Sequence, residues 1–181
     1  EGGPVPVQVI RVFTDEGIDG VCTVGDWRYN EMSWRQIAQL REIAIGEDPL
    51  DRERLHSKLN TASRFFESGW FGGFDNCLWD ILGKVTGLPV YDLIGKVRDK
   101  FPVYLTSGDG PLESYYEMCD LAKEKGIGAY KFHTYKGGKA DIEIFHAVKE
   151  RIGEELLLIN DPVCSYNLEE AIEVGKAMEE L

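Results

Sequence analysis

Two basic side chains stand close together in the segment Gly128–Tyr135, which is rich in aromatic and β-favouring residues. Alternate side chains of a strand point to opposite faces, so we expect Lys131 and His133 on one face and Tyr130 and Phe132 on the other. Paired basic groups at the end of an apolar strand are suited to holding a carboxylate and moving a proton beside it. The alternatives are a lysine that reaches solvent and a histidine that packs without transferring protons.

A second apolar run, Leu156–Asn160, predicts another buried strand, and Asp161 and Pro162 follow it directly. The strands of a parallel sheet end on one edge, so Lys131, His133 and Asp161 are expected to form one site or part of one. The alternative for Asp161 is an acid that begins a turn or helix ahead of Pro162. We assign no role to the other two histidines, which lie on predicted helix surfaces (His56 and His146).

The order of the predicted elements changes near residue 100. The first part predicts a hairpin of Val5–Val12 and Ile18–Val24, and then helices from the N-cap Ser33, over about 50–60, over 75–84 and over 90–95. The second part predicts strands at 103–106, 129–134 and 156–160, each followed by a helix at about 112–125, 140–152 and 168–181. Such alternation with short connections predicts right-handed βαβ units and a parallel sheet.

Two interpretations of the second part stay open from the residues alone. One is a small open α/β sheet. The other is a truncated (β/α)₈ barrel, because three βα units are too few to close a barrel and leave two parallel edge strands unpaired.

Composition narrows the classes of function. At 181 residues and 43% hydrophobic, the chain can hold one domain or two small ones, and it lacks the roughly 20 continuous apolar residues of a membrane span. No signal peptide is visible at Glu1–Pro4, and the net charge of −12 argues against nucleic acid or an anionic membrane as partner. The scattered cysteines support no zinc or redox motif, so we expect a reducing compartment, the cytoplasm (Cys22, Cys77, Cys119 and Cys164).

The residues resemble the mandelate racemase and muconate lactonizing group of the enolase superfamily over essentially the whole chain. Thr14–Gly20 resembles the hairpin of its N-terminal capping domain, and Leu78–Lys84 with Gly87–Gly95 resembles the stretch that joins cap to barrel. The resemblance implies an α+β capping domain at residues 1–98, without its extreme N-terminus. Residues 99–181 would then be a partial TIM-barrel domain, the first three βα units of an incomplete (β/α)₈ barrel.

The resemblance also implies a chemistry. In such enzymes acids on successive barrel strands hold Mg²⁺, a base removes the proton α to a carboxylate, and the metal stabilises the resulting enediolate. Asp161 matches the first metal ligand, and Lys131 matches the first lysine of the family's Lys-x-Lys motif. His133 stands where the second lysine, the proton-transfer base, usually lies. Val163 stands where related members often have asparagine, and the other metal acids are expected after Leu181.

The function implied by the resemblance is that of a magnesium-dependent lyase or isomerase acting on a hydroxy acid or sugar acid, as a dehydratase or as a racemase or epimerase. Its partner would be a small carboxylate substrate, neither nucleic acid nor a membrane, and the full-length form would be a homo-oligomer. We expect the 181-residue chain alone, with half a site, to be inactive. Trp27, Arg28 and Tyr29 are interpreted either as a substrate-covering loop of the cap or as a structural aromatic turn.

Two further hypotheses stay open. The chain is a non-catalytic fragment that assembles with a partner chain, or it is a free-standing α/β module that binds small acids.

Overall fold

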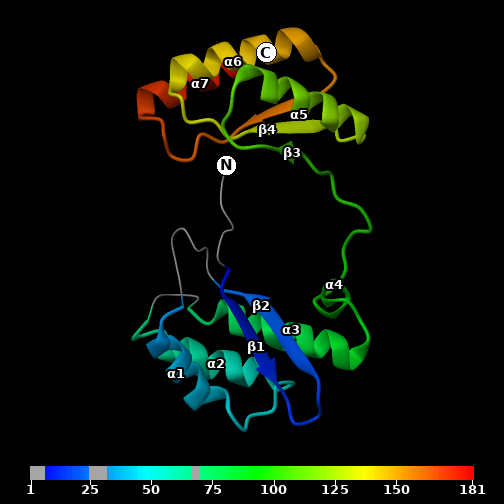
Figure 1. The fold of residues 1–181 in the computed structure, drawn as a ribbon, viewed down its shortest axis with the longest axis vertical. Helices are drawn as coiled ribbons and strands as arrows, with labels where there is room; N and C mark the ends of the chain where they lie inside the picture. The colour runs from blue at the N-terminus through cyan, green and yellow to red at the C-terminus, as the bar shows by residue number, and fades with distance from the viewer. Residues whose placement is uncertain (1–6, 25–31, 67–69) are drawn as a thin grey trace. The chain divides into compact units, whose positions relative to one another are not determined.

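The structure is a computed structural model that describes residues 7–24, 32–66 and 70–181 (Figure 1). The chain divides into two compact units, Glu1–Val97 (unit 1) and Arg98–Leu181 (unit 2), which we describe separately. No helix in the described ranges combines the length and apolar composition needed to cross a bilayer. The loop expected at Trp27, Arg28 and Tyr29 lies outside the described residues.

Unit 1 pairs an antiparallel hairpin with helices. The hairpin strands β1 and β2 run in register from Val9 opposite Thr23 to Phe13 opposite Asp19. The elements of this unit are β1 (Val9–Phe13), β2 (Asp19–Thr23), α1 (Trp34–Ala44), α2 (Arg52–Ala62), α3 (Gly72–Thr86) and α4 (Val90–Leu93). The predicted hairpin is therefore confirmed, with shorter strands than the sequence indicated.

Local side-chain chemistry sets the helix starts of unit 1. The predicted N-cap Ser33 is confirmed, because its hydroxyl accepts from the backbone N–H of Gln36 while the Gln36 side chain accepts from the backbone of Ser33. The predicted start of α3 at residue 75 is wrong by three residues, since the backbone N–H of Asp75 already donates to the carbonyl of Phe71 at 3.0 Å. Gly72 and Gly73 lie in the first turn of this helix, which packing against the rest of the unit supports.

The core of unit 1 lies between the hairpin, α1, α2 and α3. Strand β2 approaches α3 so closely that a Cβ atom on Gly20 would lie 2.2 Å from the carbonyl oxygen of Cys77. Only glycine fits at that position. The buried hydrophobic side chains around the helices of this unit include Leu40, Leu55, Leu59, Trp70, Phe71, Phe74 and Leu78.

Unit 2 alternates strands and helices. Its elements are β3 (Leu105–Thr106), α5 (Leu112–Glu124), β4 (Ala129–Phe132), α6 (Gly138–Ile152), β5 (Leu157–Asn160) and α7 (Leu168–Glu179). The sheet order is β3-β4-β5 and both strand pairs are parallel, so the predicted parallel sheet is confirmed. Strand β4 ends two residues before the predicted Thr134, which places His133 in the connection after the strand. Residues 133–137 then connect the strand to α6.

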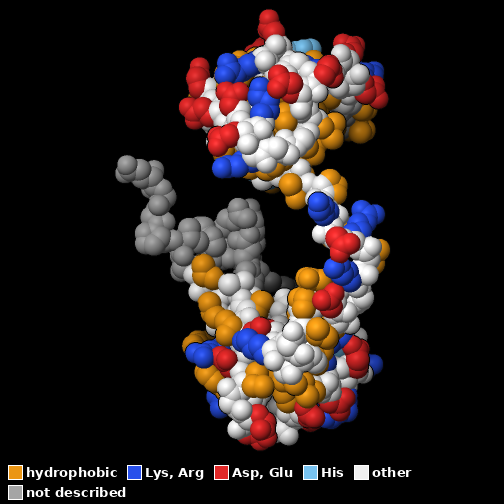
Figure 2. Space-filling model, turned by 90° about the vertical axis from the view of Figure 1, so that its right-hand side faces the viewer, with side chains coloured by type: hydrophobic (Ala, Val, Ile, Leu, Met, Phe, Trp, Pro, Cys, Tyr) orange, Lys and Arg blue, Asp and Glu red, His pale blue; other side chains and the backbone are white. Residues whose placement is uncertain are grey.

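The two faces of this sheet differ. Figure 1 shows α5, α6 and α7 on the same side of the strands. Tyr130 and Phe132 point to that side, are fully buried and pack with Tyr115 and Phe145 of the helices. Lys131 is only partly buried and Leu157 is 66% exposed, and both belong to the face without helices. Hydrophobic side chains also reach the surface of each unit, as Figure 2 shows in orange. Unit 2 is therefore a sheet covered on one face.

Candidate functional site

The three residues singled out from the sequence meet at the ends of β4 and β5. The backbone N–H of Asp161 donates to the carbonyl of Phe132 at 3.0 Å, which holds Asp161 at the end of the ladder. Its carboxylate oxygen Oδ2 lies 2.7 Å from Lys131 Nζ and 3.6 Å from His133 Nδ1. The structure therefore brings Lys131, His133 and Asp161 to one side of the sheet, as the side-chain alternation predicted.

The other carboxylate oxygen of Asp161 is held by its own loop. Oδ1 accepts a hydrogen bond from the backbone N–H of Val163 at 3.2 Å. Val163 and Cys164 both have left-handed backbone conformations, with φ of 52° and 59°. A positive φ is unfavourable for a β-branched residue, so the surrounding structure must hold this turn in place. The turn fixes the direction of the Asp161 carboxylate.

Lys131 and Asp161 form a charged pair. The hydrogen bond to Asp161 holds the pKa of Lys131 above its usual value, and the bond from Lys131 holds the pKa of Asp161 below its own. The Lys131 ammonium also lies 5.5 Å from the centre of the Tyr104 ring, and the Thr106 hydroxyl donates to the Lys131 carbonyl at 3.1 Å. The lysine is thus anchored at both its backbone and its ammonium group.

His133 is the less constrained of the two bases. Its ring stands edge-on to that of Tyr135, with 5.6 Å between the centroids, and about one third of its side chain is exposed. The 3.6 Å separation from Asp161 is longer than a hydrogen bond. The partly exposed imidazole of His133 is consequently held less tightly than the Lys131 ammonium.

The side chains at the strand ends meet only part of what a magnesium ion requires. Asp161 offers a carboxylate, the hard oxygen ligand that Mg²⁺ prefers, and its side chain is 40% exposed. Within the described ranges, no three His, Cys, Asp or Glu side chains gather closely enough to enclose a metal ion. Near-octahedral Mg²⁺ normally needs more than one carboxylate or a substrate oxygen. Among the described residues, Asp161 is therefore a single candidate ligand for such a site.

The sequence did not predict a cluster of polar side chains that lies on the covered face behind the strand ends, which we call the buried polar group (Thr134, Asp141, Asn160 and Tyr166). Thr134 and Asp141 are fully buried, and Asp141 Oδ2 accepts a hydrogen bond from the Tyr166 hydroxyl at 2.6 Å. Asn160, partly buried, directs its amide Nδ2 towards the same hydroxyl at 3.4 Å. The strand alternation that placed Lys131 could have placed Thr134 and Asn160 on the opposite, covered face. Nothing in the pattern indicated that Asp141 is buried, since acids in a first helical turn are usually exposed.

A second ion pair joins two loops at this end of unit 2. Lys136, after β4, pairs with Asp109, after β3, and donates to the Gly110 carbonyl at 2.8 Å. Tyr115 also donates to Asp109, at 2.7 Å. These contacts join the loop after β3 to the loop after β4.

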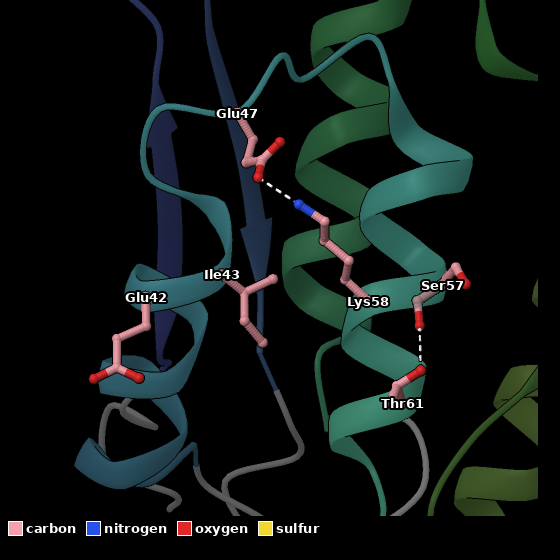
Figure 3. A pocket seen from close by; sticks show the side chains of 6 residues that line it. All are labelled: Glu42, Ile43, Glu47, Ser57, Lys58 and Thr61. Carbon is pink, nitrogen blue, oxygen red and sulfur yellow. Dashed lines mark hydrogen bonds and ion pairs between the residues drawn. The ribbon is translucent and has the colours of Figure 1, made fainter.

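Unit 1 offers weaker candidates. A shallow pocket of about 470 Å³ lies between α1 and α2, where an ion pair joins Lys58 to Glu47; Figure 3 shows its lining (Glu42, Ile43, Glu47, Ser57, Lys58 and Thr61). A larger hollow of about 1190 Å³ beside the hairpin is lined mainly by apolar side chains. His56 Nδ1 faces Asp75 at 3.5 Å, and His146 of unit 2 is exposed on α6. Asp75 likewise meets a cation and an imidazole, Arg52 at 3.0 Å and His56 at 3.5 Å, but these residues lie on α2 and α3 rather than at the ends of parallel strands.

Residues 4–95 match the sequence family described as mandelate racemase / muconate lactonizing enzyme, N-terminal domain. The chain belongs to this family. The hairpin, α1, α2, α3 and α4 all fall within the matched residues. The mandelate racemase and muconate lactonizing group named from the sequence resemblance is thereby confirmed.

Similar proteins extend the match through unit 2. L-talarate/galactarate dehydratase of Salmonella typhimurium is 31% identical over 97% of this chain and 47% of its own length. N-succinyl-L-Arg/Lys racemase of Bacillus cereus is 27% identical over 85% of this chain and 43% of its own. The crystal structure of an L-talarate/galactarate dehydratase mutant liganded with Mg and L-glucarate superposes with a TM-score of 0.79 at 29% identity, over 95% of this chain and 46% of that one. This member of the mandelate racemase family therefore spans about half the length of such relatives.

Proposed function

We propose that the chain is the first part of an enzyme that removes the proton α to the carboxylate of a hydroxy acid or sugar acid. In this proposal residues 1–98 are the capping domain and residues 99–181 are the first three βα units of a (β/α)₈ barrel. The single observation that carries the proposal is the meeting of Lys131, His133 and Asp161 at the ends of two parallel strands. Active sites of such barrels lie at that end of the strands.

The shape of unit 2 supports the barrel. All three helices lie on one side of the sheet, as in a barrel, whereas a doubly wound sheet carries helices on both sides. The uncovered face exposes Leu157 and holds the charged pair of Lys131 and Asp161. Strands β3 and β5 are the edges of the described sheet. Further strands would cover this face and pair with these edges.

Each side chain of the site has a role in proton abstraction. Asp161 would hold magnesium, which supplies positive charge to the substrate carboxylate when it is bound. The Lys131 ammonium neutralises the same carboxylate as negative charge develops on it. The His133 imidazole takes the α proton, because histidine is the side chain most often used as a general base and no hydrogen bond within the described residues ties it to Asp161.

Both dehydration and racemisation begin with this abstraction. The dehydratase and the racemase among the relatives agree with either outcome. A dehydratase next expels a hydroxyl from the adjacent carbon, whereas a racemase returns the proton to the opposite face. We infer that groups outside the described residues decide between the two.

Exchange of the α proton in D₂O, followed by NMR, tests the proposal for either outcome. The full-length polypeptide that carries this chain would be screened against hydroxy acids and sugar acids with Mg²⁺ or with EDTA. We expect exchange or turnover only with Mg²⁺, and a loss of about 10³-fold in Asp161→Asn, because electrostatic stabilisation of developing charge is typically a term of this size.

Three outcomes would contradict parts of this proposal. Turnover that persists in EDTA, or in Asp161→Asn, contradicts the assignment of Asp161. Saturable binding of acids with neither exchange nor turnover would instead support the small-acid-binding module. Residues 1–181 alone are expected to be inactive, since one exposed carboxylate binds Mg²⁺ weakly.

A further inference from the structure

Tyr166 is the central residue of the buried polar group behind the site. Its hydroxyl donates a hydrogen bond to Asp141 Oδ2 at 2.6 Å and accepts one from the Asn160 amide Nδ2 at 3.4 Å. Burial, together with the bond to Asp141, raises the pKa of Tyr166 to about 12, so the hydroxyl keeps its proton throughout the neutral range. The Tyr166 hydroxyl therefore keeps its proton for the hydrogen bond to Asp141.

Two members of the buried polar group are sequence neighbours of the proposed site residues. Thr134 follows His133, and Asn160 precedes Asp161. Phe132 and Asn160 are paired in the parallel register, which places Asn160 on the helix-covered face while Asp161 points the other way. A displacement of the backbone behind the strand ends would therefore move His133 and Asp161 in front of them.

The bond between Tyr166 and Asp141 also links the connection after β5 to the start of α6. Tyr166 ends the segment between β5 and α7, whereas Asp141 lies in the first turn of α6, just after the connection from β4. The start of α6 packs closely on α7, because a Cβ atom on Gly138 would lie 3.3 Å from Glu170 Cβ and from Val174 Cγ2. The bond between Tyr166 and Asp141 thus joins the two loops that leave the site.

This arrangement is costly for stability. Within the described part of the chain, Asp141 is fully buried and has no ion-pair partner. Three buried oxygen atoms also have no hydrogen-bond partner: Thr134 Oγ1, Asp141 Oδ1 and Asn160 Oδ1. Apolar side chains of similar volume would often make a more stable core. A buried polar group with unpaired members calls for an explanation other than stability.

We propose that Tyr166 is a positioning residue, which fixes the backbone behind His133 and Asp161 through its bond to the buried carboxylate of Asp141. The expected effect on catalysis rests on the proposed function. The expected effect on the positions of His133 and Asp161 does not. Asp161 must lie at hydrogen-bond distance from Lys131. Tyr166 holds the ends of β4 and β5 in the positions that allow this contact.

The test compares Tyr166→Phe with Tyr115→Phe in the full-length polypeptide. The control makes the same chemical change, since Tyr115 is fully buried and its hydroxyl also donates to a carboxylate, that of Asp109, at 2.7 Å. Neither Tyr115 nor Asp109 adjoins Lys131, His133 or Asp161 in sequence. Crystal structures and steady-state kinetics of both variants are the readouts.

We expect crystals of Tyr166→Phe to lose the 2.7 Å contact between Lys131 Nζ and Asp161 Oδ2, and crystals of Tyr115→Phe to keep it. In kinetics, kcat of Tyr166→Phe should fall about 10–100-fold more than that of Tyr115→Phe, the usual size of an effect exerted through supporting residues. KM should change far less. Adding Asp141→Asn to Tyr166→Phe should leave kcat low, whatever it does to thermal stability, because the bond that fixes the backbone stays absent.

Two results would overturn the proposal: an unmoved Asp161 in the Tyr166→Phe crystal, or recovery of kcat in the double variant. If the parent protein turns over no acid, the crystallographic comparison still decides on Tyr166, and only the proposed function fails.

Discussion

The two units bury different chemistry. In unit 1 the buried side chains within the described residues are hydrophobic, and β2 lies against α3 at a distance set by Gly20. Unit 2 buries Thr134 and Asp141 as well as its apolar core, and it gathers charged side chains at one end of its sheet. Unit 1 depends on close apolar packing, whereas unit 2 also buries polar groups that depend on specific hydrogen bonds. Substitutions in the two units should therefore fail in different ways.

The largest effect is expected in unit 2. In the full-length polypeptide, His133→Asn should lower kcat by about 10²–10⁴-fold, because a general base typically contributes that much. Thermal stability should change little, since the ring is partly exposed and lies beyond hydrogen-bond distance of Asp161. Calorimetry with Mg²⁺ should show nearly unchanged affinity.

The matched control for that variant is His146→Asn, which alters an exposed histidine on α6 of the same unit. It should leave kcat and stability unchanged. Equal losses in the two variants would show that His133 acts only through the fold.

An intermediate effect is expected in unit 1, on stability alone. Gly20→Ala places a methyl group 2.2 Å from the Cys77 carbonyl oxygen, and the backbone must move to admit it. Overpacking of this kind costs about 1–3 kcal/mol or somewhat more. Denaturant unfolding, monitored by circular dichroism, measures the change in the free energy of unfolding.

Gly72→Ala is the control, because a Cβ atom there has no heavy atom within 4 Å. Its effect should stay within about 1 kcal/mol and be stabilising, since alanine restricts the unfolded chain. If the two alanine variants were equally stable, close approach of β2 to α3 would not be what specifies unit 1.

The smallest effect concerns acid sensitivity, and both units should show it. Asp161 and Asp80 each have a pKa held below the ordinary 3.8 by a lysine, Lys131 in unit 2 and Lys84 in unit 1. A lowered pKa in the folded protein adds stability that is present above pH 3.8 and is lost as the pH falls through the folded value. Lys131→Met and Lys84→Met should each melt slightly below the parent at pH 6 and converge with it near pH 2. A Lys131→Met difference that persisted at pH 2 would point to packing rather than charge.

Much of this architecture could be predicted from the sequence because local signals agree with the fold. Ser33 and Asn167 both form the capping boxes that their neighbours allow, and the apolar runs of unit 2 became parallel strands. The meeting of Lys131 with Asp161 followed from side-chain alternation and from the parallel order.

The sequence failed where tertiary contacts decide. The glycines before Asp75 form helix because the rest of unit 1 supports the turn, against their intrinsic preference. Asp141 is buried because Tyr166 reaches it from a segment 25 residues away, and no local pattern reports such a partner. The catalytic roles of Lys131, His133 and Asp161 stay predictions, since geometry alone does not assign them.

The turn after Asp161 has a consequence for how this protein can evolve. Val163 and Cys164 adopt a backbone that glycine and asparagine accept readily and valine resists. Replacing Val163 by asparagine would relax the turn while keeping the N–H that meets Asp161 Oδ1. Natural sequences rarely sit at their stability optimum. Position 163 is therefore a place where variation can add tolerance for later mutations in the neighbouring loops without touching the charged groups themselves.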